Sequence, residues 1–220
     1  NSYYNSLGSR VNRSERGTLT RPALAEVLAY RAHVDRHLVA LLADTDTLPE
    51  AARELVEIGL QHEQQHQELL ATDIKYILST SPLHPVYTPA PAPTDPGALA
   101  PPATWLPMPG GVYPVGFRGE GFCFDNELPM HDALVPDFEL QNRLVTNAEY
   151  LAFVEADGYR DFRHWLGEGW DLAQLEGWQA PLYWVQTADG QWQRFTHHGL
   201  RPLEMAAPVT HVSFYEADAY

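Results

Sequence analysis

A proline-rich stretch at residues 81–109 constrains this chain more than any other feature. It reads SPLHPVYTPAPAPTDPGALAPPATWLPMP and holds ten of the eighteen prolines in 220 residues. Proline removes a backbone donor and restricts the preceding residue to extended conformations, so the stretch predicts a semi-rigid linker rather than a helix or a central strand. The linker separates residues 1–80 from residues 110–220, and the two parts carry different patterns.

Residues 1–80 contain two long helical patterns. The first spans about residues 22–43, with Thr20 as its expected N-cap. The second spans about residues 49–78 and begins at a proline, which suits a first helical turn. Two long amphipathic helices with a short connection predict antiparallel neighbours in a helical bundle.

Residues 110–220 consist of short segments that are punctuated by glycine and rich in aromatic residues. Residues 110–117 and 133–140 resemble strands, and residues 181–196 predict a hairpin that turns at Asp189-Gly190. This part of the chain therefore predicts a mixed α+β domain, and the whole chain is expected to be α+β.

Two capping boxes mark helix starts in the same part. Thr146 with Glu149 opens a helix that Gly158 is expected to close, and Ser213 with Glu216 opens another. The second box lies next to the last residue, and the first residue is not Met. We therefore expect both domains to be incomplete.

The charge balance bears on the partners. The formal net charge is -15, which disfavours nucleic acid and anionic membranes, and no run of about 18 apolar residues predicts a spanning helix. A local basic cluster at Arg10, Arg13 and Arg16 could still bind a small acid. Cys123 is the only cysteine, so no internal disulfide is possible, and we expect a cytoplasmic protein.

Two histidines interrupt the second helical pattern in GLQHEQQHQELLATD, residues 59–73. His62 and His66 fall within about 20° of the centre of its apolar stripe, with Asp73 in line. Burying an unpaired imidazole costs roughly 2 kcal/mol or more, and a divalent metal held by both rings would remove that cost. The pattern therefore favours a metal site over a pair of hydrogen-bonded core histidines.

Two neighbouring patterns limit this interpretation. His33 and His37 have the same spacing, but they project about 100° or more from the stripe of their own helix, towards solvent. HEQQH also fits the zinc protease motif, with Glu63 as general base. The extended motif needs a glycine and a histidine where Leu69 and Thr72 stand, which argues against a protease.

The chain resembles the sulfoxide synthases of ergothioneine biosynthesis along essentially its whole length. The first part resembles their DinB-like helical bundle, and the second resembles their domain with the fold of formylglycine-generating enzymes and C-type lectins. The segments that carry the resemblance are NSYYNSLGSR, RGTLTRPALAEVLAYRAHVD, GLQHEQQHQELLATDIKYIL, MPGGVYPVGF, FDNELPMHDALVPDFEL, VTNAEYLAFVEADGY, PLYW and PVTHVSFYEADAY.

The resemblance implies a non-haem Fe(II) enzyme with three histidine ligands. Two of these match His62 and His66, and the third would lie before Asn1. Such enzymes use O2 to join the sulfur of γ-glutamylcysteine, or of cysteine, to the imidazole C2 of Nα-trimethylhistidine, giving a sulfoxide. The catalytic tyrosine of the family would lie beyond Tyr220, so no catalytic residue is assigned in this chain and we expect no activity from it alone.

The resemblance also implies substrate contacts. Gln65, at the edge of the stripe, would hydrogen-bond a substrate imidazole, and Arg13 and Arg16 would hold a substrate carboxylate. Cys123 is interpreted as a small apolar residue and residues 125–127 as a structural loop.

Three other functions remain open. One is the related synthase of the ovothiol path, which joins cysteine to free histidine at another ring carbon. A second is a metal-dependent thiol transferase that works with zinc or nickel and without O2. The third is a binding module in which the histidines are structural.

Overall fold

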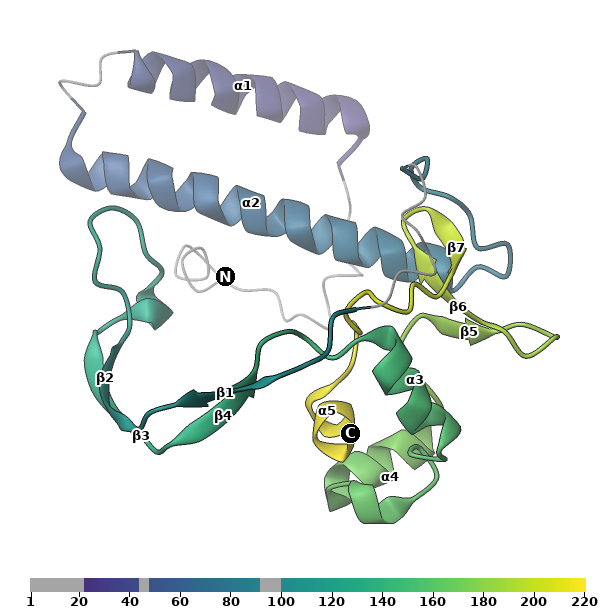
Figure 1. Cartoon of the computed structure of the whole chain (residues 1–220). Helices are drawn as coiled ribbons and strands as arrows, with labels where there is room; N and C mark the ends of the chain where they lie inside the picture. The colour runs from purple at the N-terminus through teal and green to yellow at the C-terminus, as the bar shows by residue number, and fades with distance from the viewer. Residues whose placement is uncertain (1–21, 44–47, 92–99) are drawn as a thin grey trace. The chain divides into compact units, whose positions relative to one another are not determined.

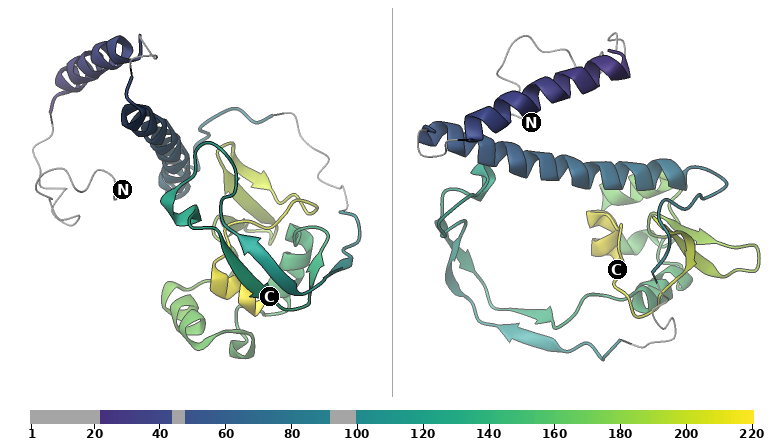
Figure 2. Two further views of the ribbon diagram at one scale, coloured as in Figure 1. Left: turned by 90° about the vertical axis from the view of Figure 1, so that its left-hand side faces the viewer. Right: turned by 90° about the horizontal axis from the view of Figure 1, so that it is seen from above.

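The computed structural model describes residues 22–43, 48–91 and 100–220, and the chain divides into two units between Gln61 and His62. The helical predictions for the first part are confirmed by α1 (Leu24–Leu42) and α2 (Glu50–Ser79), and α2 is one uninterrupted helix (Figure 1, Figure 2). Thr20, the expected N-cap, lies outside the described residues. The arrangement of these helices as a bundle stays a prediction.

A long two-stranded ribbon begins within the last residues of the proline-rich stretch. Its strands are β1 (Trp105–Met108), β2 (Gly111–Val115), β3 (His131–Val135) and β4 (Phe138–Gln141). β1 pairs with β4 and β2 with β3, both antiparallel and in one continuous register (Figure 1). The ladder is interrupted at Pro109 and Gly110, which stand opposite Asp137 and Pro136 in this register. Proline has no N–H to donate, which explains the break.

The position of β1 corrects one expectation. Residues 105–108 belong to the stretch predicted as linker, yet they form a strand that pairs with β4. Proline is tolerated in edge strands, and both strands of a two-stranded ribbon are edges, which explains why Pro107 does not prevent the pairing. The predicted strands at residues 110–117 and 133–140 are confirmed, although the second is divided into β3 and β4.

A three-stranded antiparallel sheet forms the other β element. It contains β5 (Trp184–Gln186), β6 (Trp192–Thr196) and β7 (Gly199–Pro202), in the order β5-β6-β7. The predicted turn between β5 and β6 is confirmed: Gly190 has φ +83°, a conformation that favours glycine, and Thr187 N–H donates to the Gln191 carbonyl at 2.9 Å. The fold class is therefore α+β, with helices and small antiparallel sheets.

The helices of the second part are short. They are α3 (Asn147–Glu155), α4 (Gly167–Glu176) and α5 (Phe214–Ala219), with 3-10 turns at Asp125–Glu127 and Phe162–His164. Both predicted capping boxes are present at α3 and α5. The last α-helical residue of α3 is Glu155, three residues before Gly158.

These helices enclose the main core. Its buried residues are Tyr150, Tyr159, Trp165, Ala173 and Ala219. Glu216 is buried beside them, and its carboxylate accepts hydrogen bonds from the Tyr159 hydroxyl and the Ser213 amide, both at 2.6 Å. A buried carboxylate with two donors is satisfied, so this polar group stabilises the core instead of opening it to water.

Among the described residues, neither of the long helices nor any other is apolar enough over a sufficient length to cross a membrane.

Candidate functional site

The predicted metal ligands lie one turn apart on α2. The centroids of the His62 and His66 rings are 4.5 Å apart, with the rings edge to face. His62 is half-buried and His66 is exposed. Two imidazoles at this separation can turn towards one ion, so the pair suits two ligands of a shared metal.

The expected burial of these rings is wrong for the described residues. The apolar stripe of α2 is largely exposed, with Leu55 at 69%, Leu69 at 54% and Leu70 at 67% of full exposure. The half-buried residues Ile74, Lys75 and Leu78 in the last turns lie roughly 100° to 160° around the helix axis from the centre of the stripe. Helical periodicity shows which face is apolar, but the elements that pack against the helix decide which face is covered.

The second histidine pair does not differ in spacing. His33 and His37 on α1 have ring centroids 4.4 Å apart, and both side chains are exposed. Ring separation therefore cannot distinguish the two pairs. The partial burial of His62 is a structural difference in favour of the pair on α2.

The donor set fits a metal only in part. In residues 22–43, 48–91 and 100–220 there is no group of three or more His, Cys, Asp or Glu side chains that could hold an ion. His62 and His66 could therefore provide two ligands, and the described residues offer no third. Gln65 is exposed beside them, as a residue that meets a bound substrate would be. Arg13 and Arg16 lie outside the described residues.

The loop residues 123–127 have a structural role. Cys123 is half-buried. The Glu127 carboxylate accepts the Phe124 amide at 2.8 Å and so caps the short 3-10 turn Asp125–Glu127. These contacts agree with the interpretation of the acidic loop as structural.

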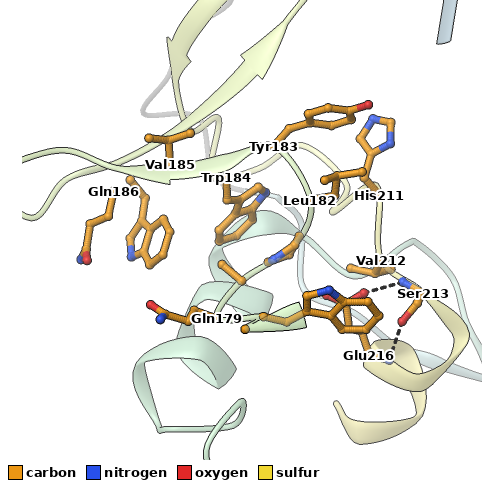
Figure 3. A pocket seen from close by; sticks show the side chains of 15 residues that line it. Gln179, Leu182, Tyr183, Trp184, Val185, Gln186, His211, Val212, Ser213 and Glu216 are labelled. Carbon is orange, nitrogen blue, oxygen red and sulfur yellow. Dashed lines mark hydrogen bonds between the residues drawn. The ribbon is translucent and has the colours of Figure 1, made fainter. Parts of the chain in front are cut away.

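A cavity of about 750 Å³ lies near the β5–β6–β7 sheet (Figure 3). Three tryptophans, Trp178, Trp184 and Trp192, form much of its apolar wall, and no described residue of α2 lines it. Tyr183 and His211 lie together at one end (Figure 3). This cavity could not be predicted from the sequence, because its walls come from segments that are separated along the chain.

One contact of α2 was also not predicted from the sequence. Lys75 is the only lysine in the chain, and its Nζ lies 2.7 Å from His211 Nε2 and 4.4 Å from the centroid of the Tyr183 ring. A lone lysine within a helical apolar pattern was the only signal that could have indicated it.

The family follows from comparison with known proteins. Residues 94–220 match the model of the sulfatase-modifying factor enzyme 1-like domain, which is more than half of the chain. The chain belongs to this family. The matched region contains the ribbon, the three-stranded sheet and the helical core.

Named relatives extend the similarity. The chain is 35% identical to hercynine oxygenase of Mycolicibacterium thermoresistibile over 82% of its own length and 39% of the relative's, and 34% identical to that of Mycolicibacterium smegmatis over 80% and 40%. It is 30% identical to the formylglycine-generating enzyme of Streptomyces coelicolor over 61% and 48%. The chain thus spans about 40% of the length of the hercynine oxygenases it matches.

Proposed function

We propose that this chain is part of an Fe(II)-dependent oxygenase that acts on hercynine, which is Nα-trimethylhistidine, in ergothioneine biosynthesis. The observation that carries the proposal is the extent of the similarity. It covers 82% of the chain, more than the part matched by the family model, so it includes helical residues before residue 94. The helix with His62 and His66 lies in that preceding part.

The proposed site is built on α2. His62 and His66 would hold Fe(II), with a third imidazole from outside the described residues. Bound iron would supply the binding and activation of O2. Gln65, exposed next to this pair, would donate a hydrogen bond to the substrate imidazole, and Arg13 and Arg16 would pair with substrate carboxylates. The residues present fit two of the ligand positions.

The reaction proposed is oxidative formation of a C–S bond. The thiol of γ-glutamylcysteine, or of cysteine, loses its proton and the imidazole loses the hydrogen on C2. One atom of O2 goes to sulfur as the sulfoxide, and the other leaves as water. O2 therefore accepts the four electrons released by forming the C–S bond and oxidising the sulfur.

Metal binding tests the site. We expect His62→Ala and His66→Ala each to weaken binding of Fe(II), or of Co(II) as a spectroscopic substitute, by at least about tenfold, which is about 1.4 kcal/mol. His33→Ala is the matched control, because that residue has the same spacing to its neighbour on α1. Calorimetric titration of each chain gives the affinities. Equal loss in the α1 and α2 variants would contradict the assignment.

The substrate is tested on the full-length protein that contains these residues. We expect O2 consumption and a sulfoxide product with trimethylhistidine plus a thiol substrate, measured by an oxygen electrode and mass spectrometry. A preference for free histidine would indicate the ovothiol-type synthase instead. Turnover without O2 would indicate a thiol transferase, and unchanged iron content in His62→Ala would indicate a binding module.

A further inference from the structure

Lys75 links the last turns of α2 to the rings of Tyr183 and His211. The ammonium of this half-buried lysine donates to His211 Nε2 at 2.7 Å and lies over the ring of Tyr183. Tyr183 and His211 pack edge to face with centroids 4.7 Å apart (Figure 3). Lysine has no acceptor, so His211 accepts through Nε2 and carries its proton on Nδ1.

The backbone conformation at Tyr183 and His211 is unusual. Tyr183 has φ +76° and His211 has φ +61°, a left-handed conformation that is uncommon for residues other than glycine. Such conformations persist only where the surroundings fix them, and they cluster where a side chain must be held in place. The Leu182 amide also donates to the His211 carbonyl at 3.2 Å, which joins the two segments.

The directions of the pKa shifts of His211 and Lys75 agree with this hydrogen bond. Burial, with the charges of Lys75 and Arg194, lowers the pKa of His211 and keeps its ring neutral, so that Nε2 can accept. Burial, and then the charge of Arg194, also lowers the pKa of Lys75. Since the ammonium is half-desolvated, its hydrogen bond is stronger than one in water.

A second contact lies one turn earlier on the same face of α2. His197, in the turn between β6 and β7, has Nε2 2.8 Å from the Ala71 carbonyl oxygen, and its ring lies 5.9 Å from that of Tyr87. Two contacts one turn apart on one face hold a helix against both sliding and rotation about its axis. The carboxyl-terminal end of α2 lies beside β6 and β7 (Figure 1).

The contacts of Lys75 and Ala71 determine the direction in which the His62 and His66 side chains point. At about 100° per residue, His62 and His66 lie roughly 140° to 220° around the helix axis from Ala71 and Lys75. The two imidazoles therefore face away from the side of α2 that carries Ala71 and Lys75. A rotation of the helix by a small angle would move both rings together, because all four residues belong to one uninterrupted helix.

We propose that Lys75 is a positioning residue for the His62–His66 pair, acting with His211, Tyr183 and His197 to fix the rotation of α2. The proposal rests on the proposed function, in which these histidines hold the metal. Lys75 touches neither the metal nor the substrate, and it acts by setting the direction of the two imidazoles.

The test compares Lys75→Met, Lys75→Arg and Glu68→Gln in the full-length protein that contains these residues. Methionine keeps the length and helix propensity of lysine but removes the charge and the donors. Glu68→Gln is the matched control, because Glu68 is exposed on the same face two turns earlier. Three readouts are taken: amide hydrogen exchange of residues 71–79, Co(II) affinity with the visible spectrum, and the imidazole NMR shifts of His62 and His66.

We expect Lys75→Met to speed amide exchange in the last turns of α2 by about tenfold, the effect of losing a hydrogen bond to a charged group. We expect it also to weaken Co(II) binding, to change the visible spectrum and to shift both imidazole signals. Lys75→Arg should restore part of each effect, and Glu68→Gln should resemble the unaltered chain.

The outcomes separate the two proposals. Faster exchange with unchanged imidazole shifts and Co(II) spectrum would make Lys75 merely structural and overturn the inference, as would no change at all. If the unaltered full-length protein that contains these residues binds no Co(II) at His62 and His66, the proposed function fails. The imidazole NMR shifts of His62 and His66 would then still show whether Lys75 positions these two rings.

Discussion

Glu149, in the first turn of α3, carries a strongly perturbed carboxylate. Arg143 donates to both of its oxygens, at 2.6 and 2.8 Å, and the Thr146 amide donates at 2.9 Å. These contacts, that of Arg143 first, lower the pKa of Glu149 to about 2. Because the folded pKa is below the unfolded one, this stabilisation is present above the unfolded pKa and is lost as the pH falls through the folded value.

We therefore predict an acid-dependent contribution from this single residue. Glu149→Gln should lower the free energy of unfolding by about 1–2 kcal/mol at pH 7, a figure reduced for solvent screening of a partly exposed pair, and by much less below about pH 2. Urea unfolding at several pH values measures this difference. Glu155→Gln, exposed on the same helix, is the control. A pH-independent loss would refute the assignment.

The crossing of α4 and α5 depends on a residue without a side chain. A Cβ added to Gly169 would lie 2.6 Å from ring atoms of Tyr215 and 2.7 Å from its Cβ, which is fixed to the backbone of α5. We predict that Gly169→Ala destabilises the chain by about 1–3 kcal/mol, because the helices must separate. Gly167→Ala on the same helix meets nothing within 4 Å and should change the free energy of unfolding by less than about 0.5 kcal/mol in urea titrations. Equal effects would contradict this.

Elements were predictable where their cause is local. The capping boxes at Thr146 and Ser213 and the turn at Gly190 follow from short-range hydrogen bonds and backbone preferences, and all three are present. Strand β1 was not predicted because pairing with β4, thirty or more positions away, outweighs the prolines of the stretch.

The site was predictable only in part for the same reason. The i,i+4 spacing of His62 and His66 on a helix is local and is confirmed, whereas their burial depends on distant partners and was wrong. The covered face is the one carrying Lys75, whose partners Tyr183 and His211 are more than a hundred positions away in the sequence. No periodicity within the helix could indicate them.

At the scale of the whole molecule, stability is unevenly distributed. Among the described residues, every member of the buried apolar core except Leu48 lies between Tyr150 and Ala219, and α1 and α2 contain no fully buried residue. All six tryptophans also lie in the second unit, between Trp105 and Trp192. Tryptophan fluorescence therefore reports on that unit, while far-ultraviolet circular dichroism reports mainly on the long helices.

We predict that these two signals do not coincide on heating. The ellipticity at 222 nm should fall first, as the long helices melt, and the tryptophan emission should shift at a higher temperature, as the core around Tyr150 opens. Parallel thermal scans by both methods test this. Superimposable transitions would show that the long helices and the core unfold as one cooperative unit.

The ribbon formed by β1 to β4 has a further consequence for the behaviour of the chain in solution. A two-stranded ribbon offers two open edges, and this one displays large apolar side chains such as Trp105 and Leu134. Such a surface invites a neighbouring chain to add a strand. Pro107 and Pro114 within the strands, with Pro109 and Pro136 at the interruption, each withhold an amide hydrogen that an incoming strand would need. The prolines that allow an extended path therefore also act as a safeguard against intermolecular sheet growth.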